Sequence, residues 1–447
     1  MTSHESASAR PLTAAEIDAV RTDFPYLKRP ARNGEPLAYL DWAATSQKPA
    51  DVIEREASFY RMTNGAAGRS TYQIADEATR VWEDAREAVA GFVGARGSQL
   101  VFTKNATEAI NLVALAVGHA SAGRPAARGG AGADDADPAR RLVIAPGDEI
   151  VVTRAEHHAN LVPWQELAAR TGASLRWLDL TEDGRIDPTT VRVITERTRL
   201  LALTHASNVT GAITPLVDIL PAARAVGALV VLDTCQSAAH LPLDFAALHA
   251  AGVDAMVLSS HKMLGPTGIG ALVAAEELLE AMPPMLTGGS MIEVVRMESS
   301  TYMSGPARFE AGSQPLAQAA GWRTAVDYLS GLGMDRLHAG ELDLMQRVLD
   351  GLAALDGVRV LGPADTRERL GVVAFTVDGV HPHDVGQVLD ASGVAVRTGH
   401  HCAQPIHAHF GAASSSRVSF GPTSTPAEAD RFLEAVASVR SYFRRRA

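Results

Sequence analysis

Short apolar runs recur along the first two thirds of the chain, and turns or helical stretches separate them. Because these runs are apolar throughout instead of alternating with polar residues, they predict parallel strands buried on both faces, as in an α/β fold. The runs are Leu100-Val101-Phe102, Ile150-Val151-Val152, Leu200-Leu201-Ala202-Leu203, Leu229-Val230-Val231-Leu232 and Met256-Val257-Leu258.

A second pattern begins after about Arg323. Strands expected at 357–361, 371–377 and 394–396, with a helix near 384–391, predict a smaller α+β C-terminal domain. We therefore expect an N-terminal arm (1–36) that packs with the small domain, a large domain (37–324), and a small domain (325–447) with the Cys402 loop. Residues 118–141 are rich in Ala, Gly, Arg and Asp, which predicts a flexible, exposed insertion.

Polar residues stand where the predicted strands end. Asp233 closes one apolar run, Asn208 and His157 follow two others, and Lys262 comes shortly after Met256-Val257-Leu258. The carboxyl ends of parallel strands meet at one edge of a sheet, where ligands collect. We therefore expect these four side chains to lie together.

The same edge offers the groups that pyridoxal phosphate requires. Ala106 and Thr107 open a helical stretch after a strand, and a helix N-terminus binds anions such as phosphate. Asp233 fits the carboxylate that the pyridine nitrogen needs, and Lys262 fits the lysine that the aldehyde needs. Taken alone, Lys262 would be an ordinary lysine at a turn. A dinucleotide site would be the competing use of such a sheet, but no G-x-G-x-x-G follows a strand.

The chain contains two cysteines, which excludes a disulfide framework and fits a reducing cytoplasm. Cys235 is interpreted as a small buried side chain. Cys402 lies in a predicted loop, with Arg397, His400 and His401 close in sequence. Neighbouring positive or hydrogen-bonding groups favour the thiolate, so Cys402 is a candidate nucleophile.

Composition excludes other classes. The formal net charge of −10 argues against a nucleic-acid-binding protein. No apolar run has membrane-spanning length, and the first residues lack the pattern of a signal peptide, which predicts a cytoplasmic protein without a membrane partner. The histidines near Cys402 include no C-x₂-C pair, so we expect no metal site.

Several longer motifs, spread over nearly the whole chain from Tyr39, resemble one family. The chain is similar to the SufS-type (group II) cysteine desulfurases, which belong to the class-V aminotransferases among the fold-type I pyridoxal-phosphate enzymes. The matching motifs are Glu156-His157-His158-Ala159-Asn160, Asp233-Thr234-Cys235-Gln236, His261-Lys262, Gly265-Pro266-Thr267-Gly268, Gly288-Gly289-Ser290-Met291-Ile292, Arg308-Phe309-Glu310-Ala311-Gly312 and Arg397-Thr398-Gly399-His400-His401-Cys402.

This resemblance implies a seven-stranded, mostly parallel sheet in the large domain and a role for each matching residue. Lys262 would carry the cofactor, His157 would stack on its ring, and Asp233 would pair with the ring nitrogen. The remaining implied contacts are Asn208 and Gln236 near the phenolic oxygen; Ala106, Thr107, Ser259, His261 and Ser313 of the partner subunit at the phosphate; and Asn208, Arg397 and Arg417 near the substrate, with Arg417 on its carboxylate.

The resemblance also implies a reaction and partners. L-cysteine would become L-alanine, with Lys262 taking the α-proton, His157 carrying the proton of the substrate thiol, and Cys402 receiving the sulfur as a persulfide. The sulfur would serve the assembly of iron–sulfur clusters or thio-cofactors. The implied partners are a second copy of the chain, as a homodimer, and a sulfur-acceptor protein of the SufU or SufE type.

Three motifs depart from the family pattern. Gly68-Arg69-Ser70 stands where the family commonly has His-Arg-Gly, and Gly312-Ser313-Gln314-Pro315 where it has Gly-Thr-Pro. Thr423-Ser424-Thr425 replaces the usual Tyr-Asn-Thr. Ser313 keeps a hydroxyl for phosphate, whereas the other two departures fall where the family shapes the active-site entrance.

Two other functions stay open. The chain could be a selenocysteine lyase, or another pyridoxal-phosphate-dependent C–S lyase or epimerase of a specialised pathway, in which Cys402 is not needed. It could also be an inactive subunit of an assembly. The joint presence of Lys262, Asp233, His157 and Cys402 argues against the inactive subunit, which has no chemical reason to keep all four.

Overall fold

The central element of the protein is a seven-stranded sheet. The computed structural model describes residues 9–68, 70–123 and 138–444. In sheet order the strands are β2 (Leu100–Thr103), β8 (Gly270–Ala274), β7 (Ala255–Ser259), β6 (Leu229–Asp233), β5 (Thr198–Thr204), β3 (Glu149–Thr153) and β4 (Ser174–Leu178). Only β8 runs antiparallel to its neighbours in this sheet. The expected large domain with a mostly parallel sheet is confirmed.

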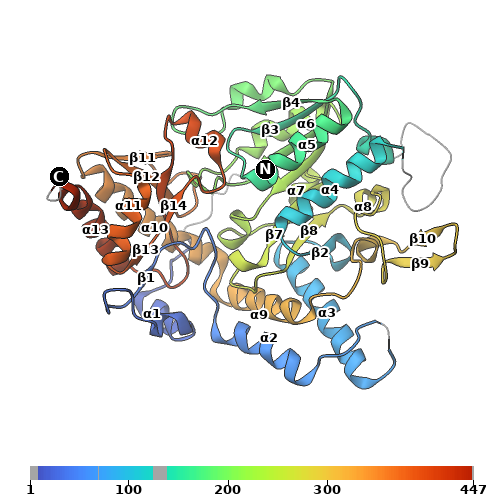
Figure 1. The fold of residues 1–447 in the computed structure, drawn as a ribbon, viewed down its shortest axis with the longest axis horizontal. Helices are drawn as coiled ribbons and strands as arrows, with labels where there is room; N and C mark the ends of the chain where they lie inside the picture. Colours follow the sequence, from blue (N-terminus) through green and yellow to red (C-terminus); the bar gives the residue numbers. More distant parts are fainter. Residues whose placement is uncertain (1–8, 69, 124–137, 445–447) are drawn as a thin grey trace.

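Helices cover both faces of this sheet because successive residues of each strand point to opposite sides. On β6, Val230 and Leu232 pack with the first group of helices, whereas Leu229 and Val231 pack with the second. The first group is α3 (Gln73–Phe92), α6 (Leu216–Ala225), α7 (Phe245–Ala251) and α9 (Leu316–Leu332), and the second is α4 (Ala106–Ser121), α5 (Val162–Thr171) and α8 (Glu276–Ala281). Helix α2 (Ala50–Met62) lies along α9 (Figure 1).

The C-terminal part forms a second, smaller layer of helices and sheet, drawn in orange and red in Figure 1. Its antiparallel sheet has the order β11 (Val358–Leu361), β12 (Val372–Val377), β15 (Ser415–Ser419) and β14 (Arg397–Gly399). Its helices are α10 (Met334–Ala353), α11 (Pro382–Ala391), α12 (Gln404–His409) and α13 (Pro426–Arg444). A separate apolar core joins α10, α11 and α13 to β12 and β15.

The N-terminal segment lies against this smaller layer. Helix α1 (Ala14–Thr22) contributes Arg21, whose guanidinium pairs with Glu428 at 3.0 Å. Strand β1 (Ala38–Tyr39) pairs in parallel with β13 (Val394–Ala395). The domain boundary expected after residue 324 falls inside α9, which continues to Leu332 because its apolar face runs on through Leu329.

The structure differs from the expected insertion at 118–141 at both ends. Residues 118–121 continue α4, and 138–142 form a 3₁₀ turn, η3 (Pro138–Leu142). Arg141 is tied down, since its guanidinium bonds both carboxylate oxygens of Asp254 at 2.8 and 2.9 Å. The residues between, 124–137, lie outside the described residues, as does Arg69 of the first departure from the family pattern.

A β-hairpin projects from the large domain at the far side from the smaller layer (Figure 1). It consists of β9 (Ile292–Val295) and β10 (Ser300–Tyr302), paired antiparallel. The remaining 3₁₀ turns are η1 (Pro25–Lys28), η2 (Gly97–Gln99), η4 (His158–Asn160), η5 (Pro188–Val193), η6 (Ser237–Ala239), η7 (Ser260–Lys262) and η8 (Gly305–Phe309). Within the described ranges, no helix combines the length and apolar character needed to cross a membrane.

Candidate active site

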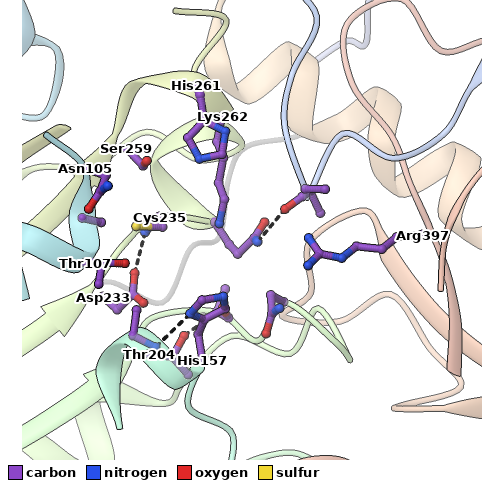
Figure 2. A pocket seen from close by; sticks show the side chains of 17 residues that line it. Asn105, Thr107, His157, Thr204, Asp233, Cys235, Ser259, His261, Lys262 and Arg397 are labelled. Carbon is purple, nitrogen blue, oxygen red and sulfur yellow. Dashed lines mark hydrogen bonds between the residues drawn. The ribbon is translucent and has the colours of Figure 1, made fainter. Parts of the chain in front are cut away.

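The carboxyl ends of the parallel strands open into a cavity of about 260 Å³. Its walls come from segments far apart in the sequence, with Lys262, Asp233 and His157 pointing into the same space (Figure 2). The predicted residues that line the cavity are Ala106, Thr107, His157, Asn208, Asp233, Gln236, Ser259, His261, Lys262 and Arg397. Three predicted residues do not line it, namely Ser313, Arg417 and Cys402.

Lys262 and Asp233 reach the cavity from neighbouring strands. Lys262 ends the 3₁₀ turn η7 directly after β7, and Asp233 is the last residue of β6. The Asp233 carboxylate accepts a hydrogen bond from the backbone N–H of Cys235 at 2.9 Å, which fixes one oxygen. An aspartate that closes a fully buried strand is held rigidly, so its other oxygen keeps one direction in the cavity.

His157 is held neutral. Its Nδ1 accepts a hydrogen bond from the backbone N–H of Ala159 at 3.1 Å, so the ring proton lies on Nε2. Burial, and next the charge of Lys262, lower the pKa of His157 to about 4. The ring can therefore accept a further proton, on Nδ1, only when the Ala159 bond opens.

Glu156, directly before His157, anchors the loop that carries His157. The carboxylate accepts hydrogen bonds from the Thr153 hydroxyl at 2.7 Å, the Thr204 backbone N–H at 2.8 Å and the Asn160 amide at 2.6 Å. The side chain is fully buried, and burial raises the pKa of Glu156 to about 8. This residue thus ties β3, β5 and the His157 loop into one unit.

The N-terminus of α4 forms the wall of the cavity that is suited to an anion. The Asn105 side chain caps the helix by accepting from the backbone N–H of Glu108 at 2.9 Å. The N–H groups of the first turn have no partner within the helix, and the helix dipole adds positive potential there. Thr107, Ser259 and His261 surround the same end of the cavity (Figure 2).

The polar groups facing the cavity fit pyridoxal phosphate. The amide nitrogens of Asn208 and Gln236 donate to the backbone oxygens of His401 and Ala43, at 2.6 and 3.0 Å. The amide oxygens of both side chains are buried and have no hydrogen-bond partner among the described residues. Because unpaired buried polar atoms are costly, this wall is suited to a polar guest. Lys262, Asp233 and the α4 N-terminus match the aldehyde, pyridine nitrogen and phosphate of that cofactor.

The two predicted substrate arginines occupy different places. Arg397, on β14, reaches into the cavity from the side opposite Asn105 and Thr107 (Figure 2). Arg417, on β15, is fully buried and donates to the backbone oxygen of Asn208 at 2.9 Å and to the Asp41 carboxylate at 3.1 Å. Burial lowers the pKa of Arg417 to about 10 and raises the pKa of Asp41. The structure therefore brings Arg397, and not Arg417, to the cavity surface.

Cys402 lies beside the cavity instead of in its wall. Its Sγ atom is 3.7 Å from Nη2 of Arg397. Its backbone oxygen accepts a hydrogen bond from the backbone N–H of His158 at 2.6 Å, directly beside His157. His401 and Cys402 have φ angles of 51° and 56°, in the left-handed region, where each non-glycine residue costs roughly 1–2 kcal/mol. The surrounding contacts must hold this conformation.

Ser313 is exposed in the single chain and is not part of the cavity wall. The motif before it is firmly anchored, because both Glu310 oxygens bond the Arg86 guanidinium at 2.7 and 2.8 Å, and one also accepts from the Phe102 N–H. Arg308 donates to the backbone oxygens of Met303, Leu279 and Glu280. These contacts anchor the segment 308–313, which we call the Ser313 arm and which carries the exposed Ser313 shortly before α9.

Sequence reasoning missed part of the cavity wall. Its unpredicted members are Ala43, Ala44, Asn105, Ala159, Thr204, Ala206 and Cys235. The Asn105 cap, followed by Glu108, carried a readable signal, because asparagine favours the N-cap position. Ala43 and Ala44 carried none, since only the fold brings them to the cavity, where the Ala43 backbone oxygen accepts from Gln236. No group of three or more metal-ligating side chains occurs in the described segments.

Comparison with known proteins agrees with this geometry. Residues 38–127 and 136–432 match the aminotransferase class-V family. A protein of Mycobacterium leprae (strain TN) named "Probable cysteine desulfurase 2" is 48% identical over 434 residues, which are 97% of this chain and 99% of the relative. The apo structure of a cysteine desulfurase from Thermococcus onnurineus NA1 is 33% identical, with a TM-score of 0.85, over 95% of this chain and 98% of that one.

A cysteine desulfurase from Escherichia coli, solved in an S-sulfonic acid form, is 34% identical with a TM-score of 0.82 and covers the same shares of both chains. Family match, near-complete coverage and fold all agree with the cavity described above. The chain therefore belongs to the class-V aminotransferases, pyridoxal-phosphate enzymes of fold type I.

Proposed function

We propose that this protein is a cysteine desulfurase of the SufS type, which converts L-cysteine to L-alanine and takes the sulfur onto Cys402 as a persulfide. The observation that carries the proposal is the contact of 3.7 Å between Cys402 and Arg397, because Arg397 lines the same cavity as Lys262. The similarity to proteins named cysteine desulfurases over nearly the whole chain supports it.

The residues of the cavity divide the binding of the cofactor among them. Lys262 would bond its aldehyde carbon, Asp233 would hold a proton on its ring nitrogen, and His157 would lie on its ring. The α4 N-terminus at Ala106 and Thr107, with Ser259 and His261, would hold its phosphate. When bound, pyridoxal phosphate supplies an electron sink for the charge that develops at the substrate Cα.

Two residues would move protons. The Lys262 amine would accept the α-proton of L-cysteine and later return a proton to the product. His157, which is neutral above about pH 4, would accept the proton of the substrate thiol once its own hydrogen bonds rearrange.

Cys402 would perform the sulfur transfer. Its thiolate attacks the substrate sulfur, the new S–S bond forms, and the bond between Cβ and sulfur breaks. The electron pair of the broken bond stays with the three-carbon fragment, which takes up protons and leaves as alanine. The sum of the step is one persulfide and one alanine from one thiol and one L-cysteine, so no external oxidant is needed.

Arg397 is the side chain that we assign to the substrate carboxylate. It lines the cavity, whereas Arg417 is engaged by Asp41 and by the Asn208 backbone. Arg417 would then act indirectly, by holding Asn208 in place through its backbone oxygen. Only a rearrangement of the Asp41 pair would bring Arg417 onto the carboxylate that the family resemblance assigns to it.

We further propose a homodimer in which Ser313 reaches the phosphate site of the second copy. Ser313 stands exposed on the Ser313 arm and has no role within its own chain's cavity. The nearby β9–β10 hairpin exposes Val295 and Met297 to 61% and 96%, although both are apolar. Adjacent exposed apolar side chains of this kind mark an interaction surface.

The persulfide would pass to an acceptor protein of the SufU or SufE type, for iron–sulfur cluster or thio-cofactor assembly in the cytoplasm. Cys402 is partly exposed, and its neighbour His400 lies at the surface, so a partner thiol can approach. Both cysteines are free, as a reducing compartment requires.

The decisive experiment is incubation of the purified holoenzyme with L-cysteine and a reductant, with alanine and sulfide measured together. Equal amounts of both are expected. Sulfide without alanine would indicate a C–S lyase instead, and turnover of selenocysteine alone would indicate a selenocysteine lyase.

A further inference from the structure

Two buried histidines and a serine form a hydrogen-bonded chain behind Cys402. Nε2 of His401 and Nε2 of His407 each lie 2.9 Å from the hydroxyl of Ser415. Nδ1 of His407 lies 2.9 Å from the backbone oxygen of Ala403. All three side chains are buried, and none of them lines the cofactor cavity.

The donors and acceptors in this chain are fixed by chemistry. Since a carbonyl oxygen only accepts, Nδ1 of His407 must donate to Ala403. Nε2 of neutral His407 then accepts from the Ser415 hydroxyl, and Ser415 accepts in turn from Nε2 of His401. Burial lowers the pKa of both histidines, which keeps them neutral as this order requires.

The two ends of this chain of hydrogen bonds lie on the residues that flank Cys402. One end is the side chain of His401 and the other is the backbone oxygen of Ala403, and both lead to Ser415. Ser415 itself is fixed by β15, where it pairs with Gly399 of β14. The sheet thus holds Cys402 from both neighbours through one hydroxyl group.

The opposite side of the Cys402 loop is held by the large domain. The backbone oxygens of His401 and Cys402 accept from the Asn208 amide and the His158 backbone N–H, both at 2.6 Å. Nε2 of His158 also accepts from the backbone N–H of Gln404 at 3.1 Å. Two consecutive residues in the left-handed region, His401 and Cys402, persist only where the surrounding contacts fix their conformation. Ser415 supplies those of the contacts that lie on the side facing away from the cavity.

We infer that Ser415, acting through His401 and His407, positions Cys402 for attack on the substrate sulfur. Ser415 touches neither cofactor nor substrate, so it is a positioning residue. The inference rests on the proposed desulfurase function for its kinetic consequence, whereas its structural consequence, the placement of the Cys402 thiol, can be measured without turnover.

The test compares Ser415→Ala with Ser416→Ala in the full-length holoenzyme. Ser416 is the next residue on β15 and is equally buried, but its hydroxyl donates to the Pro382 oxygen, away from the loop. Two rates are measured, namely alkylation of Cys402 by iodoacetamide, followed by mass spectrometry of its peptide, and alanine formation from L-cysteine. The cofactor absorbance of each variant verifies that the cavity is intact.

In Ser415→Ala we expect faster alkylation of Cys402 and a kcat lowered by about tenfold or more, since ångström-scale misplacement costs up to roughly a hundredfold. KM should change by less than about twofold, because Ser415 contacts no substrate. Ser415→Thr, which keeps the hydroxyl, should recover most of the kcat. Wild-type alkylation in Ser415→Ala, or the same changes in Ser416→Ala, would overturn the inference.

His407→Leu tests the same chain of hydrogen bonds from its His407 end. It replaces Ser415→Ala in the comparison if Ser415→Ala does not fold. If Ser415 and His407 act through one chain of hydrogen bonds, the double variant Ser415→Ala/His407→Leu should have a kcat no lower than that of the more affected single variant. Additive losses would mean separate packing roles and would also overturn the inference. If the wild type forms no alanine, the proposed function fails, while the alkylation rates still decide the role of Ser415.

Discussion

Arg397 connects the cofactor cavity to Cys402, because its side chain lines the cavity while its Nη2 atom lies 3.7 Å from the Cys402 sulfur. A substrate carboxylate bound by Arg397 would bring the substrate sulfur near Cys402. The Arg397 side chain approaches from the side of the cavity opposite Asn105 and Thr107 (Figure 2).

Arg397→Ala should therefore raise the KM for L-cysteine by about tenfold or more, because a charge-assisted bond to the carboxylate contributes roughly 1.5–3 kcal/mol. Its kcat should also fall, since the contact with Cys402 is lost. Steady-state kinetics measure both. The control is Arg199→Ala, whose side chain pairs with Asp148 on the protein surface and should leave both constants unchanged. A wild-type KM in Arg397→Ala would mean that Arg417, and not Arg397, binds the substrate carboxylate.

Lys262→Ala should abolish the covalent attachment of the cofactor. Lys262 is the lysine in the cavity wall, and it is the last residue of η7, the turn that directly follows β7. Borohydride reduction followed by mass spectrometry of the peptides measures the attachment. Lys104→Ala, at an exposed position before α4, should keep it. An adduct that persists on another lysine would contradict the assignment.

Cys402→Ser should separate substrate binding from sulfur transfer. The variant should still change the cofactor absorbance when L-cysteine is added, since those steps need Lys262 and not the thiol. Alanine release should fall by at least about a hundredfold, because a serine hydroxyl is a far poorer nucleophile toward sulfur than a thiolate. Cys235→Ser should retain most activity, because Cys235, although it lines the cavity, is buried, and burial raises the pKa of its thiol and so disfavours the thiolate. Alanine release at the wild-type rate in Cys402→Ser would favour the C–S lyase alternative.

Much of the cavity could be predicted because its chemistry follows strand ends. The apolar runs before Asp233 and Lys262 specify buried parallel strands, and such strands deliver their next residues to one edge. The same logic placed His157, Asn208 and Thr107 there. These positions depend on local sequence and on one rule of topology, so they needed no knowledge of the small domain.

The contacts of Cys402 could not be predicted, because they join segments that are distant in sequence. Ser415, His407 and His158 meet the loop only after β14 and β15 pair and the small domain docks. Arg417 was assigned to the substrate by resemblance, but the signal for its burial lies in Asp41, at the other end of the chain. Periodicity within one segment carries no information of this kind.

Val295→Asp should weaken the proposed homodimer. Val295 is 61% exposed on the hairpin beside the Ser313 arm, and burying a carboxylate in an apolar interface is unfavourable. Sedimentation equilibrium should reveal monomers for this variant and dimers for the wild type. Val217→Asp is the matched control, since Val217 is 69% exposed on α6, away from the hairpin. A wild-type protein that is a stable and active monomer would refute the shared site.

The stability of the protein should fall as the pH drops below 6.5, in part because of His401. Burial, and next the charge of Arg417, lower the pKa of His401 from 6.5 to about 2 in the folded state. Above pH 6.5 the ring is neutral in both states and contributes nothing to the pH dependence. Below pH 6.5 the unfolded chain gains a proton that the folded chain cannot accept, so unfolding is favoured by about 1.4 kcal/mol per pH unit for this residue.

His401→Asn should therefore reduce the slope of the unfolding free energy against pH below 6.5 by about 1.4 kcal/mol per unit, as measured by urea denaturation. The variant also loses its bond to Ser415, which lowers stability at every pH but leaves the slope unaffected. His400→Asn changes the adjacent, exposed histidine and should keep the wild-type slope. Equal slopes for wild type and His401→Asn would mean that His401 is protonated in the folded protein, and the hydrogen-bond order assigned to Ser415 would then be wrong as well.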